Sequence, residues 1–367
     1  MKNKKITILH IGYCPNNQTS GVAVAIPNHL KHQSMMSELK IGFLNLCSYY
    51  DLHLENVNIF LYEDYKSLKK LPKPFSNPDL IVFHELYRFP FLKLSSEARK
   101  SKIPYVIIPH GGLTNSAQKK KKIKKTFGNI FLFNKYIYSA SALQFLSSSE
   151  CVRSKKRIKK QYIIVSGSGI ELPTINYKVH NNLRIIFIGR YDIYYKGLDL
   201  LLNSLCKIRK ELYEKGVIVE LYGIGNESDE NYINNFVKKH NMGEVLHVHG
   251  PVFGENKKTI LKHADIFIQP SRSEGQPLGV IEALSYGIPV IITPGTGLAN
   301  DVENYNFGYV ANFNVDNLSK VILTAIEKKQ DLYKLSKNAR NYAEKKFNWN
   351  EIEKKLIDEY YSLLRRL

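Results

Sequence analysis

The sequence predicts an α/β protein with two doubly wound domains, each a parallel sheet covered by helices on both faces. Short apolar runs, typical of strands that are buried on both faces, alternate with helix-like segments along the chain. The runs form two series, each about the size of one doubly wound domain, separated by a stretch rich in Gly, Ser, Pro and Asn. A length of 367 residues suits two domains of ordinary size.

The strands of the first series are expected at Ile6–Ile11, Leu39–Leu46, Ile59–Tyr62, Leu80–His84, Tyr105–Pro109 and Ala142–Leu146. Those of the second are expected at Arg184–Gly189, Val217–Tyr222, Val245–Val248, Ile266–Gln269 and Pro289–Thr293. We therefore divide the chain into a domain at 1–168, a domain at 169–345 and a C-terminal helix at 346–367 that packs back toward the first domain. In this helix apolar residues recur at helical spacing, and Trp349 is expected to pack at its start.

Composition predicts a cytoplasmic globular protein. No apolar run reaches the roughly 18 residues that a transmembrane helix needs. The first residues imitate a signal peptide, but His10 interrupts the apolar stretch and no small-residue cleavage site follows, so we interpret them as a first strand. The cysteines have no C-x-x-C spacing, which predicts neither a zinc site nor a disulfide framework.

Positive charge is concentrated in the first half of the chain. Residues 1–165 contain 27 Lys and Arg against 9 Asp and Glu, so nearly all of the net charge of +20 belongs to them. Two clusters stand out, Lys119–Lys125 and Arg153–Lys160, and the first leads into an aromatic segment. Basic residues beside aromatic ones suit an anionic membrane surface, so we expect peripheral membrane contact. A solvated basic surface and nucleic-acid binding are the alternatives, and no recognisable nucleic-acid module accompanies the charge.

A strand, a Gly-rich loop, a short helix and another strand are predicted around S-R-S-E-G-Q-P-L-G-V-I-E-A-L-S-Y-G-I-P-V-I. Pro277 suits the first turn of a helix over Leu278–Tyr286, and Gly287 suits its C-terminal cap. The free N–H groups at this helix start can bind an anion such as a diphosphate. Two glutamates, Glu274 and Glu282, flank the bend. From this window alone, a turn with two solvated glutamates explains the pattern equally well.

An ordered set of motifs decides between these readings. I-I-F-I-G-R-Y-D-I-Y-Y-K-G, V-E-L-Y-G-I-G-N-E and V-H-G-P-V precede the glutamate pair, and P-H-G-G lies in the first half. Together these motifs resemble the family 4 retaining glycosyltransferases, whose E-x7-E motif the glutamates match. The resemblance extends over most of the chain. It implies a GT-B fold, with two Rossmann-like domains that face each other across a cleft, the first binding acceptor and the second binding nucleotide-sugar.

By this resemblance, Glu274 would accept hydrogen bonds from hydroxyls of the donor sugar, and Glu282 would hold the ribose of the nucleotide. Many family members carry a residue with an N–H where this chain has Pro277. The possible N–H donors of the loop are then Gln276, Leu278 and Gly279.

Arg190 and Lys196 match the family's basic pair at the end of the second domain's first strand. Because the departing nucleoside diphosphate gains charge when the anomeric C–O bond breaks, two fixed cations would stabilise the transition state. The resemblance also places two pairs of residues near the nucleotide and its base. These are Gly223 with Gly225, and Pro251 with Val252.

In the first domain, T-S-G-V with Gly21 resembles the family's glycine loop near the donor phosphates, although many members have two adjacent glycines there. His110 ends an apolar strand, where ligands gather in doubly wound sheets, and by resemblance it would contact the donor sugar. His84 and Glu85 end another strand; an acceptor contact and a purely structural role are equally open for them.

The sequence thus predicts a metal-independent, retaining hexosyltransferase that acts on a glycan or lipid-linked acceptor. We expect no cofactor apart from a nucleotide-diphosphate sugar as co-substrate, with a UDP-sugar favoured over a GDP-sugar. The basic first domain indicates a role in bacterial surface polysaccharide synthesis (capsule, exopolysaccharide or lipopolysaccharide), peripheral to the inner face of the cell membrane. The alternatives are a glycoside hydrolase that uses Glu274 and Glu282, a basic nucleic-acid-binding protein, and a non-catalytic sugar-nucleotide binder.

Overall fold

The chain forms two compact units. The first comprises Met1–Ser168 and Trp349–Leu367, and the second comprises Gly169–Asn348. The structure is a computed structural model and describes residues 5–15, 21–48, 53–119, 128–159, 161–174, 178–274 and 276–367.

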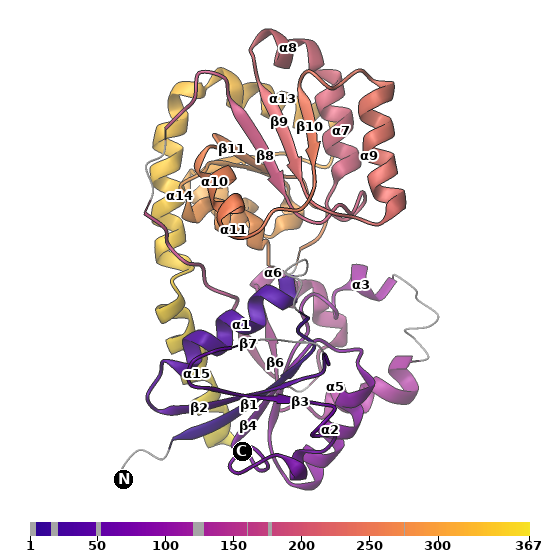
Figure 1. Cartoon of the computed structure of the whole chain (residues 1–367), viewed down its shortest axis with the longest axis vertical. Helices are drawn as coiled ribbons and strands as arrows, with labels where there is room; N and C mark the ends of the chain where they lie inside the picture. Colours follow the sequence, from indigo (N-terminus) through magenta and orange to yellow (C-terminus); the bar gives the residue numbers. More distant parts are fainter. Residues whose placement is uncertain are drawn as a thin grey trace. The chain divides into compact units, whose positions relative to one another are not determined.

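The first unit contains a seven-stranded parallel sheet in the order β3-β2-β1-β4-β5-β6-β7 (Figure 1). Its strands are β1 (Ile6–Gly12), β2 (Leu39–Asn45), β3 (Val57–Leu61), β4 (Leu80–His84), β5 (Tyr105–Ile108), β6 (Ala142–Phe145) and β7 (Tyr162–Val165). Its helices are α1 (Gly21–Ser34), α2 (Phe89–Lys100), α3 (Asn115–Lys119), α5 (Asn134–Tyr138), α6 (Ser148–Ser154) and α15 (Trp349–Arg366). Short helical turns are η1 (Leu68–Lys70), η2 (Asn129–Phe133) and η3 (Lys155–Arg157).

Helices cover both faces of this sheet because its strands are apolar on both sides. One core cluster joins strand residues such as Ile8 and Val82 to α1 and to α15, the helix that follows the second unit in the chain. The other joins Phe83 and Ile107 to α2 and α5. The terminal helix is thus a structural part of the first unit, and Trp349 at its start stacks on His32 with ring centroids 4.6 Å apart.

The second unit contains a six-stranded parallel sheet in the order β10-β9-β8-β11-β12-β13. Its strands are β8 (Arg184–Ile188), β9 (Ile218–Tyr222), β10 (Leu246–His249), β11 (Ile266–Gln269), β12 (Val290–Ile292) and β13 (Gly308–Val310). Its helices are α7 (Leu198–Lys207), α8 (Arg209–Glu214), α9 (Glu227–Lys239), α10 (Gly254–Lys262), α11 (Leu278–Ser285), α12 (Ala299–Tyr305), α13 (Val315–Glu327) and α14 (Leu332–Lys346). The turns η4 (Pro294–Thr296) and η5 (Lys329–Asp331) complete it.

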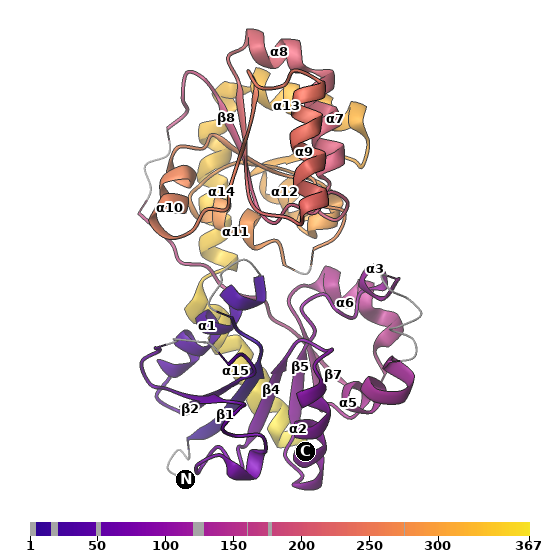
Figure 2. The ribbon, with the colours of Figure 1, turned by 45° about the vertical axis from the view of Figure 1, so that its right-hand side comes forward.

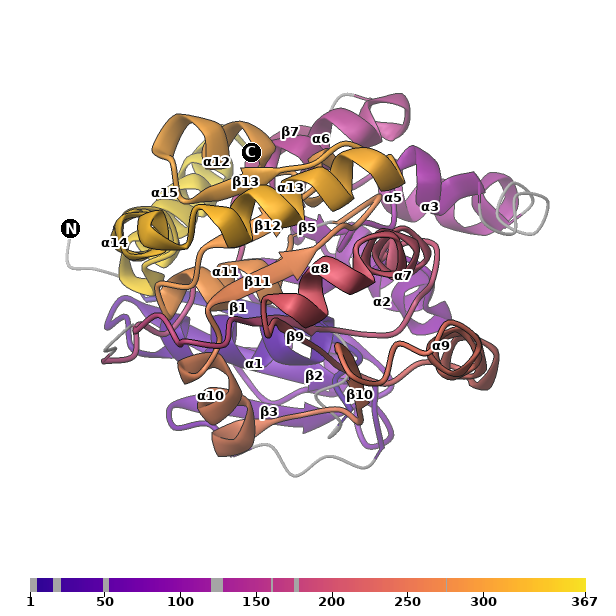
Figure 3. The same ribbon diagram turned by 90° about the horizontal axis from the view of Figure 1, so that it is seen from above.

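The helices of the second unit also divide between the two faces of its sheet. One core cluster contains residues of α7, α8, α9 and α13 with the first residues of α14, and the other contains residues of α10, α11, α12 and the later part of α14 (Figure 2). Seen from above, α7, α9 and α13 lie on one side of the sheet and α10 and α14 on the other (Figure 3). Because the strands of this sheet are parallel, their carboxyl ends share one edge, which is where such folds bind ligands.

The predicted fold class is confirmed, and every predicted strand overlaps an observed one. Two strands were not predicted, β7 and β13, which lie at one edge of each sheet. An edge strand has a single neighbour, and most side chains in these two strands are only partly buried, so neither shows the continuous buried pattern used for prediction. The helix predicted over Leu278–Tyr286 is α11, with Gly287 in the left-handed region at φ 69° as a C-terminal cap requires. Pro277 caps this helix at its N-terminus instead of lying in its first turn.

Within the described part of the chain, no helix combines the length and apolar character required to cross a bilayer.

The Tyr360→Phe substitution tests how firmly α15 belongs to the first unit. The Tyr360 hydroxyl donates a 2.6 Å hydrogen bond to Oε1 of buried Gln144, so its removal leaves an unpaired buried acceptor. We expect a loss of about 1–3 kcal/mol in the free energy of unfolding, measured by urea denaturation. The matched control is Tyr361→Phe, at a partly exposed neighbour in the same helix. Equal effects of the two substitutions would contradict this account.

Candidate active site

Glu274 lies in the loop that follows β11, with its side chain 12% exposed. Its Oε1 accepts hydrogen bonds from three donors: Nζ of Lys196 at 2.8 Å, Nε2 of Gln269 at 2.9 Å and Oγ of Ser271 at 2.6 Å. Three donors from two loops and a strand end fix both the position and the orientation of this carboxylate. Gln269 and Ser271 were not predicted as site residues. Gln269 ends the predicted strand and Ser271 begins the quoted stretch, but neither an amide nor a hydroxyl there was assigned a role.

The loop after β8 is locked to the loop after β11. Gly197 adopts φ 68°, and a Cβ at this position would lie 2.1 Å from the carbonyl oxygen of Pro270. The backbone N–H of Arg272 donates to the Tyr195 oxygen at 2.9 Å, and the Arg272 guanidinium holds Asp199 through two bonds of 2.7 and 2.8 Å. A side chain at Gly197 would force the two loops apart, so this position needs glycine.

Arg190 and Lys196 occupy different environments. Lys196 is 20% exposed and contacts Glu274, whereas Arg190 is 62% exposed and contacts Asp192, with Nη2 and Oδ2 3.2 Å apart. Asp192 also accepts the backbone N–H of Tyr195 through Oδ1 at 2.9 Å. Lys196 is therefore fixed in the site, while Arg190 is a largely exposed cation on the same loop.

The G-x-G turn after β9 packs against the loop after β8. A Cβ on Gly223 would lie 2.0 Å from the carbonyl oxygen of Gly189, and one on Gly225 would lie 2.7 Å from that of Tyr191. Tyr191 also donates its backbone N–H to Ile224 at 2.8 Å. Both glycines allow a close backbone approach at the carboxyl ends of neighbouring strands.

The start of α11 lies against the carboxyl end of β8. A Cβ on Gly279 would be 3.1 Å from the Ile188 carbonyl oxygen and 3.3 Å from Oε1 of Gln269. The N–H of Leu278 donates to the Gln276 carbonyl oxygen at 3.0 Å. Of the three predicted N–H donors, Leu278 is therefore already engaged within the loop.

Glu282 lies on α11 and forms an ion pair with Lys257 of α10. Both side chains are about a quarter exposed. Among the described residues no hydrogen bond or ion pair joins Glu274 to Glu282; each glutamate has its own lysine. The sequence analysis missed Lys257, because it lies in the charged segment G-E-N-K-K, where one lysine cannot be distinguished from the next.

A group that could hold a metal ion lies on β9 and β10, where possible ligand atoms of Glu220, His247 and His249 lie within 4.8 Å of one another. The Glu220 carboxylate already accepts hydrogen bonds from Arg184 at 2.9 Å and from Tyr222 at 2.8 Å. An ion would have to displace these donors, so the group is better described as a hydrogen-bonded network. Beyond β10, Pro251 is exposed, and Val252 is partly buried and packs on the core.

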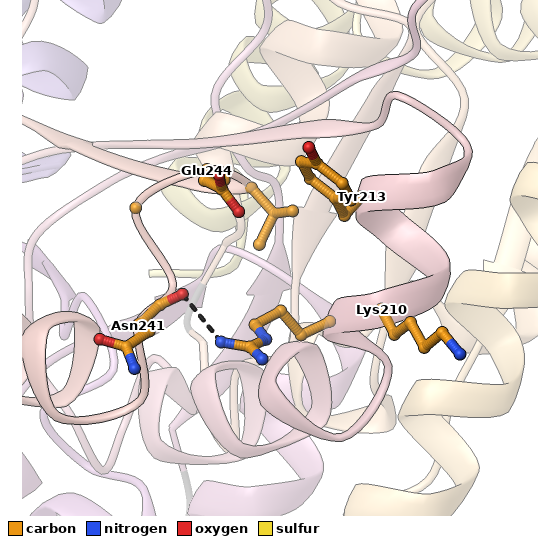
Figure 4. A pocket seen from close by; sticks show the side chains of 7 residues that line it. Lys210, Tyr213, Asn241 and Glu244 are labelled. Carbon is orange, nitrogen blue, oxygen red and sulfur yellow. Dashed lines mark hydrogen bonds between the residues drawn. The ribbon is translucent and has the colours of Figure 1, made fainter.

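A pocket of about 480 Å³ lies elsewhere in this unit, between α8 and the segment 241–245 (Figure 4). Arg209 donates to the backbone oxygen of Asn241 at 3.1 Å across its floor. These residues precede β9 and β10, so the pocket lies at the amino ends of the strands and not at the edge that carries the glycine turns.

In the first unit, His110 follows β5 with φ 48°, a left-handed conformation that is uncommon for a residue with a side chain. Its Nε2 lies 3.4 Å from Nδ1 of His84, at the end of the neighbouring strand β4. Desolvation by burial lowers the pKa of His110 to about 3, and nearby His29 adds a smaller electrostatic effect. Burial likewise lowers the pKa of His10, in β1, to about 3. These rings are therefore neutral at pH 7.

The other predicted positions of the first unit are less defined. Gly21 is exposed and begins α1, and the residues just before it lie outside the described part of the chain. Glu85 has φ 80° and binds Arg88 at 3.0 Å. Most of Lys119–Lys125 also lies outside the described residues. In Arg153–Lys160, Lys155 and Lys156 are exposed, and Lys159 lies 4.1 Å from the centre of the Tyr138 ring.

Comparison with known proteins identifies the class. Residues 171–346 match the family described as Glycosyl transferases group 1. The match covers nearly all of the second unit, so the resemblance indicated by the motifs of this unit is confirmed. An uncharacterized glycosyltransferase of Methanocaldococcus jannaschii is 22% identical to this chain, in an alignment that covers 100% of this chain and 100% of the relative. An amylovoran biosynthesis glycosyltransferase of Erwinia amylovora is 25% identical over 75% of this chain and 68% of its own.

Solved structures resemble the whole chain. The sucrose-phosphate synthase of Thermosynechococcus elongatus has a TM-score of 0.78 at 16% identity and covers 99% of this chain and 100% of its own. The Anabaena protein HepE in complex with UDP has a TM-score of 0.74 at 16% identity, covering 97% of this chain and 100% of its own. At such identities the likeness shows the fold alone.

The neutral histidines make stability depend on pH. Because the folded pKa of His10 is about 3 and the ordinary value is 6.5, the unfolded chain binds more protons between these values. The contribution of each neutral ring to the free energy of unfolding is fully present above about pH 6.5. It is lost as pH falls toward 3, by up to about 1.4 kcal/mol per pH unit for each such ring. Urea denaturation at pH 7.5, 6 and 4.5 measures the slope. The His10→Gln variant should show a shallower slope, and an unchanged slope would contradict the burial of a neutral ring.

The Gly223→Ala substitution tests the close approach of the loops after β8 and β9. Its Cβ would lie 2.0 Å from the Gly189 oxygen, so the loops must separate. We expect a loss of about 1–3 kcal/mol in the free energy of unfolding, measured by urea denaturation. The control is Gly243→Ala, whose Cβ would meet nothing within 4 Å. A Gly223→Ala protein as stable as this control would show that the turn is not packed as described.

Proposed function

We propose that this chain is a retaining glycosyltransferase that moves a hexose from a nucleotide-diphosphate sugar to a glycan or lipid-linked acceptor. The observation that carries the proposal is the fixed carboxylate of Glu274 beside Lys196, at the shared carboxyl edge of β8 and β11. It lies within residues 171–346, which match a glycosyltransferase family. The hydrolase alternative explains the two glutamates but gives no role to the lysine of each pair or to the glycine turns.

In the proposed reaction an acceptor hydroxyl oxygen bonds to the anomeric carbon, and its proton passes to an oxygen of the departing diphosphate. The anomeric C–O bond to the diphosphate breaks, and the diphosphate leaves with the electron pair. Lys196 would stabilise the charge that develops on it, with Arg190 as a second, more exposed cation and the start of α11 as a source of N–H groups. We propose that these groups take the place of a divalent metal ion. Glu274 would accept hydrogen bonds from the donor sugar, and His110, in the first unit, is proposed to contact a sugar hydroxyl.

We propose that the nucleotide binds beside this carboxylate, at the same carboxyl edge of the sheet of the second unit. Glu282 would accept hydrogen bonds from the ribose, with Lys257 keeping the carboxylate in place. Gly223 and Gly225 would let the nucleotide approach the backbone, and Pro251 and Val252 would line the base. A UDP-sugar is favoured over a GDP-sugar, and the structural likeness to a protein in complex with UDP supports this choice.

The proposed acceptor belongs to the synthesis of a bacterial surface polysaccharide. The relative from Erwinia amylovora, an amylovoran biosynthesis glycosyltransferase, supports this. The basic charge of residues 1–165 supports a place on the anionic inner face of the cell membrane, through Lys119–Lys125 and Arg153–Lys160. In the second cluster Lys155, Lys156 and Lys159 are described and exposed.

Thermal shift with UDP, GDP, ADP and dTDP tests the nucleotide site. A ligand that binds only the folded chain at a hundred times its dissociation constant stabilises it by about 2.7 kcal/mol. We expect one diphosphate, UDP first, to raise the midpoint of the wild type but not that of Glu282→Gln. Glu255→Gln is the matched control, because Glu255 is an exposed glutamate in α10 that also pairs with a lysine. No response to any nucleotide, together with sugar release in its absence, would favour a hydrolase.

A further inference from the structure

We propose that a directional chain of hydrogen bonds in the first unit sets the tautomer of His110. The chain starts at Glu353 of the terminal helix α15 and runs through Gln33, His10 and His84. In this account the four residues are positioning residues, and they hold the proton of His110 on Nε2.

The contacts that form the chain are continuous. Nε2 of Gln33 donates to Oε2 of Glu353 at 2.9 Å, and Oε1 of Gln33 lies 2.9 Å from Nε2 of His10. Nδ1 of His10 lies 3.0 Å from Nε2 of His84, and Nδ1 of His84 lies 3.4 Å from Nε2 of His110. The first four residues are at most 1% exposed, so water does not compete for these bonds.

The direction of the chain follows from the groups at its start. An ionised carboxylate can only accept hydrogen bonds, so Gln33 must present its NH2 group to Glu353 and its oxygen to His10. Because that oxygen is an acceptor, Nε2 of His10 carries the proton. A neutral imidazole has one N–H, so Nδ1 of His10 is left as an acceptor.

Because each neutral imidazole has one N–H, the tautomer of His10 also determines the tautomers of His84 and His110. Nδ1 of His10 accepts the proton on Nε2 of His84, which leaves Nδ1 of His84 to accept the proton on Nε2 of His110. Each step requires neutral rings, and burial lowers the pKa of His84 well below its usual value, as it does for His10 and His110. His110 is therefore left with an unprotonated Nδ1.

Glu353 is anchored so that it keeps its role as acceptor. Its other oxygen, Oε1, lies 2.5 Å from Nδ1 of His29, and Nε2 of His29 lies 3.2 Å from the hydroxyl of Ser168. His29 and Gln33 are one turn apart on α1, so two groups of one helix hold both oxygens of the carboxylate. The terminal helix thus supplies the charge that orients His110, the histidine that follows β5.

Nδ1 of His110 has no hydrogen-bond partner among the residues that the structure describes, and the residue is partly exposed. It presents a lone pair that can accept a hydroxyl proton. If the proposed glycosyl transfer holds, the natural donor of that proton is a substrate sugar hydroxyl. The opposite tautomer would turn this acceptor into a donor and lose the bond.

The experiment measures the ring nitrogens of His10, His84 and His110 in the full-length protein, labelled with 15N-histidine, by long-range 15N–1H NMR at neutral pH. Single substitutions of each histidine assign the signals. We expect a single Nε2–H tautomer for all three rings in the wild type. In Gln33→Met the acceptor for His10 is lost, so both tautomers should appear. Gln144→Met is the matched control: Gln144 is also buried and also bound to α15, but it does not contact the chain.

Glu353→Gln tests the same idea with little change of shape, which covers the case that Gln33→Met fails to fold. An amide at 353 can donate as well as accept, so Gln33 can reverse, and a second tautomer should again appear at His110. Unchanged His110 signals in a folded Gln33→Met or Glu353→Gln protein would overturn the proposal. These measurements need no substrate, so they stand apart from the proposed activity.

Activity then tests the consequence for catalysis. We expect kcat to fall about tenfold in Gln33→Met, the scale of one hydrogen bond, with KM for the donor little changed and Gln144→Met close to wild type. A changed tautomer with unchanged kcat would overturn the link to the sugar. Wild-type protein that shows no glycosyl transfer would refute the proposed function, and the NMR result would still decide on the chain.

Discussion

The second unit depends on one interaction, the contact between Lys196 and Glu274. It joins the loop after β8 to the loop after β11, and both side chains are mostly buried. Removal of one partner would leave a charge that water hydrates poorly, which is far costlier than the pair itself. Gly197 and the Arg272–Asp199 pair keep these loops at the distance that the contact needs. Contacts within the chain therefore hold the two loops in place, as the proposed stabilisation of developing charge requires.

In the first unit, neutral side chains and not an ion pair hold the strand-end residue in position. Its strand-end residue His110 is oriented by hydrogen bonds that begin at a carboxylate on α15. A neutral ring offers one donor and one acceptor, so in a row of neutral rings each ring fixes both the position and the tautomer of the next. In each unit, taken alone, polar side chains gather where parallel strands end, and residues from distant parts of the sequence orient them.

The sequence was sufficient to predict the elements whose pattern is local. Buried strands such as β4 and β11 show continuous apolar runs, and Glu274 and Lys196 lie in motifs of fixed spacing. The partners of these residues could not be predicted. Lys257 is one of several lysines in its segment. Gln33 and Glu353 are more than three hundred residues apart in the sequence, and they meet only because α15 packs on α1. Hydrogen bonds between such residues depend on the folded arrangement, and no local pattern marks them.

The most direct test of the account measures nucleoside diphosphate release from UDP-, GDP-, ADP- and dTDP-hexoses with bacterial membrane lipid as the acceptor. The account predicts that one donor class is consumed, that its sugar appears in the lipid fraction, and that both signals are lost in Glu274→Gln and Lys196→Met but kept in Glu255→Gln. Wild-type activity in the first two variants, or sugar release that needs no nucleotide, would contradict it.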